Sequence, residues 1–140
     1  MPAPKPSQLI VEGYEDLYAV VGLMSAHIEW PEDKRQAPVN IEIGKSVSEI
    51  LEDGYLTTIL RKPGVRNTGI MFDADTSPKG RYESVRHICM KLFPALPVEL
   101  PTSGLIVENV EQQRLGIWIM PDNSSEGSLE TFLKYLVLGL

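Results

Sequence analysis

Cysteine and histidine are scarce in this chain. One cysteine, Cys89, and two histidines occur among its 140 residues. A lone cysteine cannot form an internal disulfide, which excludes a disulfide scaffold and agrees with a reducing compartment. Cys89 falls on the apolar side of an expected helix, so we interpret it as a small core residue. His27 and His87 have no partner at ligand spacing, and the sequence predicts no histidine metal site.

Long apolar runs are also missing. No stretch approaches the roughly 20 apolar residues that a membrane-spanning helix needs, and the start MPAPKP lacks the apolar core of a signal peptide. We therefore expect a cytoplasmic protein without a membrane partner. Residues 1–140 are expected to form a single domain with a flexible lead-in over residues 1–6. Its last helix is barely finished at Leu140, so we expect a missing C-terminal part.

Positive charge is in the minority. Lys and Arg number 13 against 19 Asp and Glu, which gives a net charge of −6. A protein that binds nucleic acid without a partner usually presents a basic face, because phosphate contacts supply much of the affinity. Three interpretations stay open: the acids are concentrated in a metal site, a partner supplies the basic surface, or nucleic acid is not the ligand.

Apolar segments with strand and helix character alternate along the chain. This order predicts an α/β three-layer sandwich with a mostly parallel central sheet of about four strands, helices on both faces and an added antiparallel hairpin. A hydrophobic run such as Ile70-Met71-Phe72, without polar alternation, predicts a strand buried on both faces. The expected strands are 8–11, 39–43, 68–75, 104–109 and 115–120. The expected helices are 14–28, 46–61 with a bend at Gly54, 81–92 and 128–136.

Acidic residues follow three of the expected strands. Glu12 follows the first, Asp73 and Asp75 end the third, and Asp122 follows the last. Ligands of parallel sheets bind beyond the carboxyl ends of the strands. Side chains two residues apart on an extended chain point the same way, so Asp73 and Asp75 would attract a divalent cation such as Mg²⁺. The alternative is a turn in which both aspartates cap the backbone.

The segments LIVEGYED (9–16) and IMFDAD (70–75) resemble the Toprim domain. This family is shared by topoisomerases, bacterial primases, recombination-repair proteins and the overcoming-lysogenization-defect nucleases. Its pattern has V-E-G-x-x-D after strand one, matched by Glu12 and Asp16, and D-x-D after strand three, matched by Asp73 and Asp75. The segments 118–123 and 127–130 are similar to small stand-alone Toprim-like proteins related to those nucleases.

The resemblance implies a site. Asp73 and Asp75 would be ligands of Mg²⁺ or Mn²⁺, and Glu12 would be either a ligand or a general acid or base. Asp16, Asp122 or Glu130 could add a second metal. The predicted catalytic residues are Glu12, Asp16 and Lys79.

Three basic residues in loops at the same edge are candidates to contact phosphates: Lys45, Lys79 and Arg81. Alternatively, they balance nearby acids. The expected function is Mg²⁺-dependent phosphodiester cleavage in nucleic acid, with the domain as the effector of an ATPase partner. The sequence is also compatible with an oligomer. A non-catalytic Toprim-like module that binds a metal, a nucleotide or a protein is the alternative. A phosphatase-like or receiver-type protein fits less well, because those folds place an aspartate where this chain has Glu12.

Overall fold

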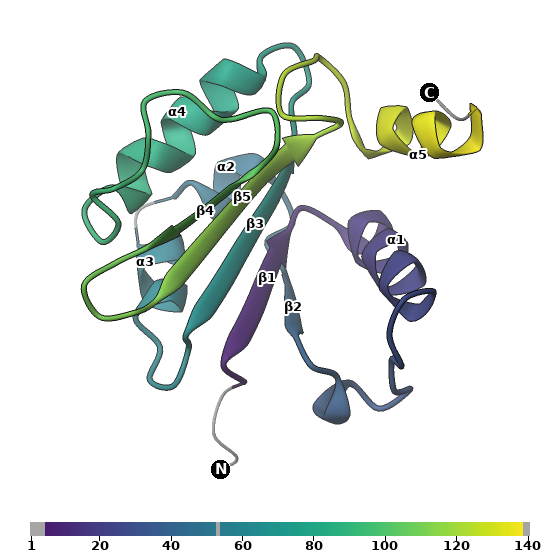
Figure 1. Ribbon diagram of the computed structural model, residues 1–140, viewed down its shortest axis with the longest axis horizontal. Helices are drawn as coiled ribbons and strands as arrows, with labels where there is room; N and C mark the ends of the chain where they lie inside the picture. Colours follow the sequence, from purple (N-terminus) through teal and green to yellow (C-terminus); the bar gives the residue numbers. More distant parts are fainter. Residues whose placement is uncertain (1–4, 53, 139–140) are drawn as a thin grey trace.

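The computed structural model describes residues 5–52 and 54–138 (Figure 1). In this part of the chain a five-stranded sheet has the order β2-β1-β3-β5-β4. Neighbouring strands are parallel except β4, which runs antiparallel to β5. The strands are β1 (Ser7–Val11), β2 (Asn40–Ile43), β3 (Asn67–Asp73), β4 (Leu105–Glu108) and β5 (Arg114–Met120), and the helices are α1 (Tyr14–Ser25), α2 (Val47–Ile50), α3 (Tyr55–Leu60), α4 (Pro78–Cys89) and α5 (Leu129–Leu138), with a 3-10 turn η1 (Lys34–Gln36).

The direction of the chain across the sheet explains which helix covers which face. From β1 to β2 the chain moves one way, and from β2 to β3 and on to β5 it moves the other way. Because parallel crossovers are almost always right-handed, this reversal transfers the connecting helices to the opposite face. Accordingly α2, α3 and α4 cover one face, while α1 lies on the other (Figure 1). The reversal occurs between β1 and β3, whose carboxyl ends form the crevice where such sheets bind ligands.

The main core lies between the sheet and α2, α3 and α4. Along β3, Ile70 and Phe72 point into this layer and are each 1% exposed. Tyr82 of α4 and Leu115 of β5 are buried in the same cluster. Burying one large apolar side chain stabilises a fold by about 1.5–3 kcal/mol, so this layer holds the strands in place. Cys89 is buried here as a core residue, as the sequence predicts.

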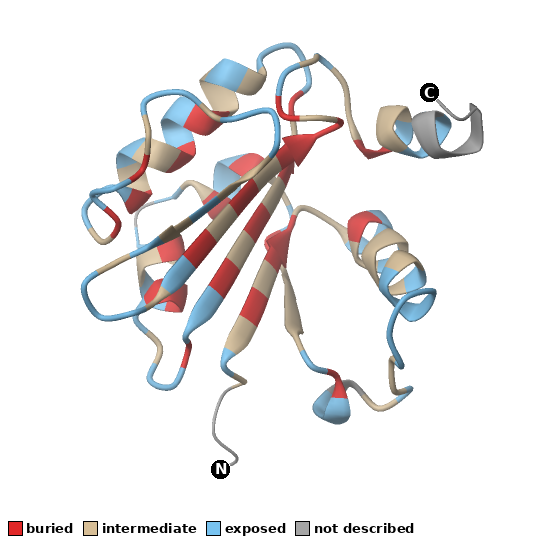
Figure 2. Ribbon diagram, in the orientation of Figure 1, coloured by how far each residue is buried: buried red, intermediate tan, exposed pale blue. Residues whose placement is uncertain are grey.

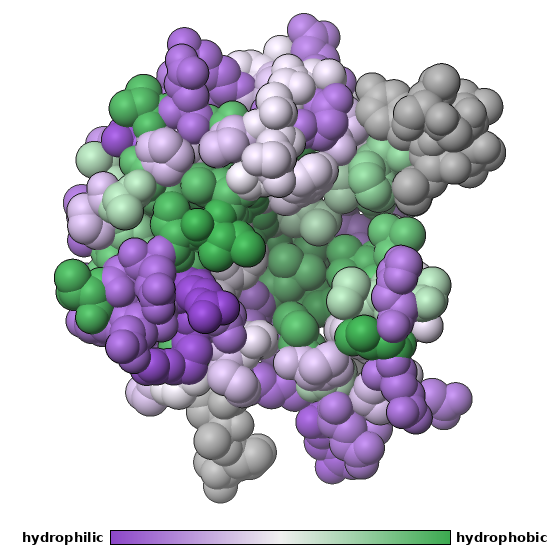
Figure 3. All heavy atoms as spheres, viewed as in Figure 1, coloured by the Kyte–Doolittle hydropathy of each residue, from purple (hydrophilic) through white to green (hydrophobic). Residues whose placement is uncertain are grey.

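The other face of the sheet is covered only in part. Figure 2 shows buried residues alternating with half-buried ones along β3 and β5. The half-buried positions include Met71 and Trp118. The prediction that the run Ile70-Met71-Phe72 is buried on both faces is therefore wrong on one side. Figure 3 views this face and shows hydrophobic side chains around a hollow beside the strands.

The predicted strands are confirmed, and their pairing refines the expected sheet. The hairpin forms between β4 and β5, and β5 also pairs with β3 as the fourth parallel strand. One helix predicted over 46–61 is two, because Gly54 adopts a left-handed φ of 88° between α2 and α3. Helix α4 begins at Pro78 rather than Arg81, because Ser77 Oγ accepts a 2.9 Å hydrogen bond from the Gly80 N–H and caps the helix.

Two predictions about the ends of elements need correction. The helix expected over 14–28 already ends at Ser25, and Met24 and Ile28, which have helical spacing in that stretch, are 37% and 42% exposed. Pro6, placed in the expected flexible lead-in, is held by backbone bonds, because its carbonyl accepts hydrogen bonds from the backbone N–H groups of Arg66 and Asn67. Residues 1–4 and 139–140, on which the other end-of-chain predictions fall, lie outside the described residues. In the described part, no helix is long and apolar enough to cross a membrane.

Candidate functional site

Two acidic residues lie at the point where the order of strands in the sheet reverses. Glu12 directly follows β1, and Asp73 is the last residue of β3, the neighbouring strand. The backbone N–H of Asp73 donates a 2.9 Å hydrogen bond to Oε2 of Glu12. The backbone of Asp73 thus orients the side chain of Glu12, and this bond holds the two residues together in the crevice. The structure thus brings together Glu12 and Asp73, which both belong to the predicted metal set.

Asp73 is also anchored from the opposite side of the crevice. Its Oδ1 accepts a 2.8 Å hydrogen bond from the backbone N–H of Leu129, in the first turn of α5. The positive end of a helix dipole lies at this position and favours a negative group. Of the four carboxylate oxygens in the pair, Glu12 Oε2 and Asp73 Oδ1 are therefore engaged by backbone donors.

Both carboxylates hold protons more tightly than usual. Burial raises the pKa of Glu12 from 4.5 to about 7, against the hydrogen bond from Asp73, and the charges of Asp73 and Asp16 raise it further. Burial likewise raises the pKa of Asp73 from 3.8 to about 6, with added repulsion from Asp16, Glu130 and Asp75. A pair of acids titrating near neutral pH in a crevice is typical of functional sites, because such groups can exchange protons or take up a cation.

Asp16 supports this cluster from α1. It is 8% exposed in the first turn of α1, and its Oδ2 accepts a 3.0 Å hydrogen bond from the Gly13 N–H. Burial raises its pKa, and the charges of Glu130 and Glu15 add to the shift. The predicted catalytic Asp16 thus orients the turn after Glu12 and adds negative charge to the crevice.

Asp75 does not point the same way as Asp73. The strand ends at Asp73, and Asp75 adopts a left-handed φ of 53°, which breaks the two-residue alternation of an extended chain. Its Oδ2 pairs with the Arg81 guanidinium at 2.6 Å. Its backbone also exchanges two hydrogen bonds with Gly127. The expectation that Asp73 and Asp75 share one face is therefore wrong, and the carboxylate of Asp75 is directed to a cation of its own chain.

Asp122 and Glu130 also have local partners. Asp122 accepts hydrogen bonds from the N–H groups and hydroxyls of Ser124 and Ser125. Slight burial raises the pKa of Asp122, but these bonds outweigh it and the net pKa is lowered. Glu130 Oε2 accepts a 2.6 Å hydrogen bond from the Ser128 hydroxyl, which lowers its pKa. The side chain of Asp122 stabilises a turn. The charge of Glu130 raises the pKa of Asp73 and of Asp16.

The three predicted phosphate-binding residues have different settings. Arg81 is held by Asp75 and also lowers the pKa of Glu12, so its positive charge reaches the crevice. Lys79 is exposed in the first turn of α4, and Lys45 is exposed after β2 with a φ of 72°. For the residues described, neither lysine forms an ion pair. The interpretation that these cations balance acids thus holds for Arg81.

Across the described ranges, no three Asp, Glu, His or Cys side chains converge closely enough to hold a metal ion by themselves. The predicted ligands are thus distributed: Glu12 and Asp73 lie together, and Asp75, Asp122 and Glu130 have other bonds. The sequence did not reveal the Leu129 N–H that orients Asp73, because a backbone donor leaves no signal in residue type. Arg81 pairs with Asp75 across a turn, and in the sequence only their opposite charges indicate this pairing.

Comparison with known proteins identifies a family without assigning an activity. Residues 6–139 match the family described as "Protein of unknown function (DUF3226)". No match was found among the curated proteins or among the solved structures. Since the match spans nearly the whole chain, this protein belongs to the DUF3226 family.

Proposed function

We propose that this member of the DUF3226 family is a Mg²⁺-dependent, phosphodiester-cleaving domain of Toprim type that acts on nucleic acid. The observation that supports the proposal is the pair Glu12 and Asp73, joined through the Asp73 N–H at the switch point of a parallel sheet. Burial is the main cause of the raised pKa of both acids, and the charge of Asp73 adds to the shift of Glu12, so ionisation of both groups together is unfavourable. A divalent cation would stabilise the ionised pair.

A two-carboxylate site suits Mg²⁺ or Mn²⁺. Mg²⁺ keeps several of its waters and is commonly held by one or two carboxylates together with substrate phosphates, rather than by a cage of protein ligands. Glu12 and Asp73 would hold the ion through the oxygens that the backbone donors leave accessible. When bound, the ion would stabilise charge on the phosphoryl group and lower the pKa of a bound water. This donor set explains why a site can exist without three converging protein ligands.

The other residues of the crevice have supporting roles in this proposal. Glu12, with a pKa of about 7, can hold or release a proton at neutral pH, as a general acid or base must. Lys79 and Lys45 lie exposed at the carboxyl edge of the sheet, where they can contact phosphates of a nucleic acid. Arg81 keeps Asp75 from adding a further uncompensated charge.

The net charge of −6 supports a partner in this activity. An acidic domain gains little from the counterion release that gives nucleic-acid binding most of its affinity. We therefore propose that an ATPase partner presents the nucleic acid, and that the domain works in the cytoplasm.

A second candidate is a non-catalytic module that binds a metal, a nucleotide or a protein. What favours it is that, over residues 5–52 and 54–138, the acids form a pair and not a cluster of three or more ligands. A module of this kind would bind Mg²⁺ at Glu12 and Asp73 and show no turnover. The two candidates therefore differ in turnover and agree on the site.

Calorimetric titration of Mg²⁺ and Mn²⁺ tests the site. Asp73→Asn keeps an oxygen that can accept the Leu129 N–H and removes the charge, so we expect metal binding to weaken at least about tenfold, or 1.4 kcal/mol. The control is Glu83→Gln, because Glu83 is an exposed acid on α4 without a hydrogen bond or ion pair in the described chain. Equal binding by wild type and Asp73→Asn would remove the metal assignment.

Turnover is tested with plasmid DNA, single-stranded DNA and structured RNA in the presence of Mn²⁺ or Mg²⁺. Cleavage that disappears in both Glu12→Gln and Asp73→Asn, and persists in Glu83→Gln, supports the catalytic reading. Metal binding without cleavage supports the non-catalytic module. Cleavage that survives loss of both acids must arise elsewhere and contradicts the proposal.

A further inference from the structure

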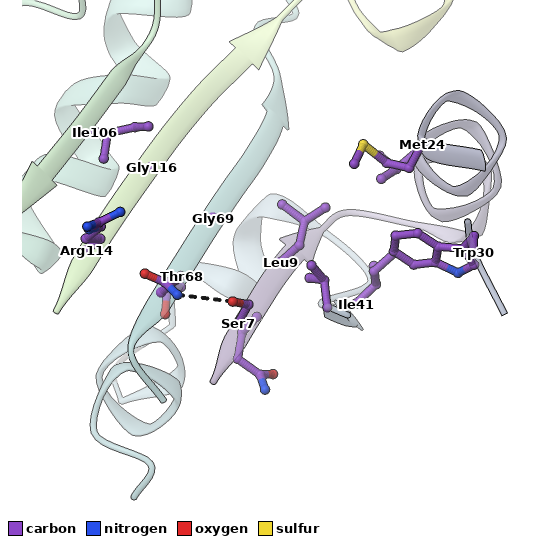
Figure 4. A pocket seen from close by; sticks show the side chains of 14 residues that line it. Ser7, Leu9, Met24, Trp30, Ile41, Thr68, Gly69, Ile106, Arg114 and Gly116 are labelled. Carbon is purple, nitrogen blue, oxygen red and sulfur yellow. Dashed lines mark hydrogen bonds between the residues drawn. The ribbon is translucent and has the colours of Figure 1, made fainter. Parts of the chain in front are cut away.

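A continuous apolar groove crosses the open face of the sheet, away from the acidic pair. It consists of two adjoining hollows of about 380 and about 500 Å³. Both are lined by Leu9, Gly69, Ile106 and Gly116, so they share one floor. Figure 4 shows the first hollow, with Met24 and Trp30 on one side and Ile106 on the other.

The floor of the groove is formed by two glycines. Gly69 of β3 and Gly116 of β5 are direct neighbours in register, which leaves the middle of the sheet bare of side chains. A Cβ on Gly116 would lie 3.6 Å from the Leu105 carbonyl oxygen, an ordinary contact distance. Packing within the chain therefore does not require glycine at this position. A glycine inside a strand commonly marks a place where another backbone or a ligand approaches closely.

The topology explains why the groove is open. Only the β1-α1-β2 crossover places its helix on this face, and α1 lies beside β1 and β2 (Figure 1). In the chain as described, no helix lies over β3, β5 and β4 on this side. In a three-layer sandwich that position is filled by a helix, which runs antiparallel to the parallel strands. The groove therefore has the place and the direction of a missing helix.

The charge at one end of the groove matches one end of such a helix. Arg114 lines the groove at the amino edge of the sheet, and Arg66 is its neighbour through a 2.8 Å backbone hydrogen bond. Both arginines are exposed, and Glu108 is opposite Arg114 in register, yet none of the three forms an ion pair within the described residues. A helix antiparallel to the strands would direct its negative end to the arginines.

We propose that this groove binds an amphipathic α-helix of a partner protein, with an apolar face on Gly69 and Gly116 and acidic residues in its last turn beside Arg114. Strands β3 and β5 have 7 residues each, so the helix spans about 23 Å, or about 15 residues. Its apolar residues replace water over Leu9, Ile106 and Trp118. The proposal does not depend on cleavage or metal binding at Glu12 and Asp73.

The test uses two synthetic helical peptides of about 18 residues, with leucines at i, i+3, i+4 and i+7. One has three glutamates in its last turn, and the other has three lysines there. Trp30 and Trp118 line the groove and report binding by a blue shift of their emission. We expect the acidic peptide to bind, and the lysine peptide to bind at least about tenfold more weakly. Arg114→Glu should reverse that preference.

Two variants test the groove without disturbing the core. Ile106→Glu changes a side chain that is 77% exposed, and Gly116→Val fills the floor where a Cβ has ordinary contact distances. Both should fold with circular dichroism spectra like that of the wild type and bind the acidic peptide at least about tenfold more weakly. The control is Val98→Glu, which changes an exposed side chain outside the groove and should bind as the wild type does.

Three results would overturn the proposal. The first is no emission shift at about 1 mM acidic peptide, where even weak binding is populated. The second is binding that Ile106→Glu and Gly116→Val leave unchanged in folded protein. The third is a wild type that sediments as a dimer and becomes monomeric in Ile106→Glu, because a second copy would then be the occupant.

Discussion

The backbone N–H of Asp73 donates a 2.9 Å hydrogen bond to the carboxylate of Glu12. This single contact fixes two acids from neighbouring strands at one point, although they are 61 residues apart in the chain. Burial of both groups then makes their ionisation unfavourable. Stability and ion binding of this protein are therefore expected to depend on the same pair.

The first prediction concerns pH. Because the pKa of Glu12 rises from 4.5 to about 7 in the folded chain, the folded state binds more protons than the unfolded state in this interval. The stabilisation is fully present below pH 4.5 and is lost as the pH rises through 7. Asp73, raised from 3.8 to about 6, acts in the same direction. Without divalent ions, urea unfolding should give a lower free energy of unfolding at pH 8 than at pH 5.

Glu12→Gln is the variant for this prediction. The amide keeps an oxygen for the Asp73 N–H and cannot ionise, so the variant should exceed the wild type at pH 8 by on the order of 1 kcal/mol, after discounting for solvent screening. At pH 5 the two proteins should be nearly equal. Glu83→Gln serves as the matched control, and an identical pH dependence of wild type and Glu12→Gln would contradict the assignment.

The second prediction distinguishes what the backbone conformation of Asp75 contributes to stability from what its carboxylate contributes. With a φ of 53°, Asp75→Ala should lose about 1 kcal/mol, because aspartate adopts the left-handed region more readily than alanine does, whereas Asp75→Gly should lose less. Its exposed pairing with Arg81 is worth at most about 1 kcal/mol. Thermal unfolding measures both variants. Since the carboxylate faces Arg81, Mg²⁺ affinity should change less in Asp75→Gly than in Asp73→Asn, and the reverse order would place Asp75 in the site.

The third prediction concerns Asn123, which is 4% exposed. Its Oδ1 accepts a 2.8 Å hydrogen bond from the Ile119 N–H, and its φ of 70° is one that asparagine tolerates. Asn123→Ala should lose about 2–3 kcal/mol, because a buried N–H is left unpaired and the backbone is strained. Gln112→Ala is the control, since Gln112 has a φ of 65° with an exposed side chain. Equal losses in urea unfolding would mean that the buried hydrogen bond contributes nothing.

The fourth prediction concerns Cys89. Burial raises the pKa of its thiol to about 12, and the side chain is fully enclosed in the core. A thiol reagent such as 5,5′-dithiobis(2-nitrobenzoic acid) should therefore react with the native protein only as fast as the chain unfolds, and at once in denaturant. Rapid reaction of the native protein at pH 8 would show that the core opens around α4.

Much of the fold follows from local patterns of residues. The apolar run around Ile70 and Phe72 predicts β3, and the core positions of α4, Tyr82 and Val85, follow from helical spacing. These predictions succeed because burial repeats with the period of each element. The glycine at position 54 predicts a bend, and its left-handed backbone makes that bend a break between α2 and α3. The early start of α4 depends on a single cap, which spacing does not determine.

The sequence by itself determined that acids follow the strands, and that Glu12 and Asp73 belong to one edge of a sheet. Only the tertiary structure decided which acids meet, because strand order places β1 beside β3 and backbone donors then orient each carboxylate. Asp75 was expected in the site, and the left-handed turn directs it to Arg81 instead. The open groove was likewise set by the order of strands, since the side of a crossover depends on its direction across the sheet.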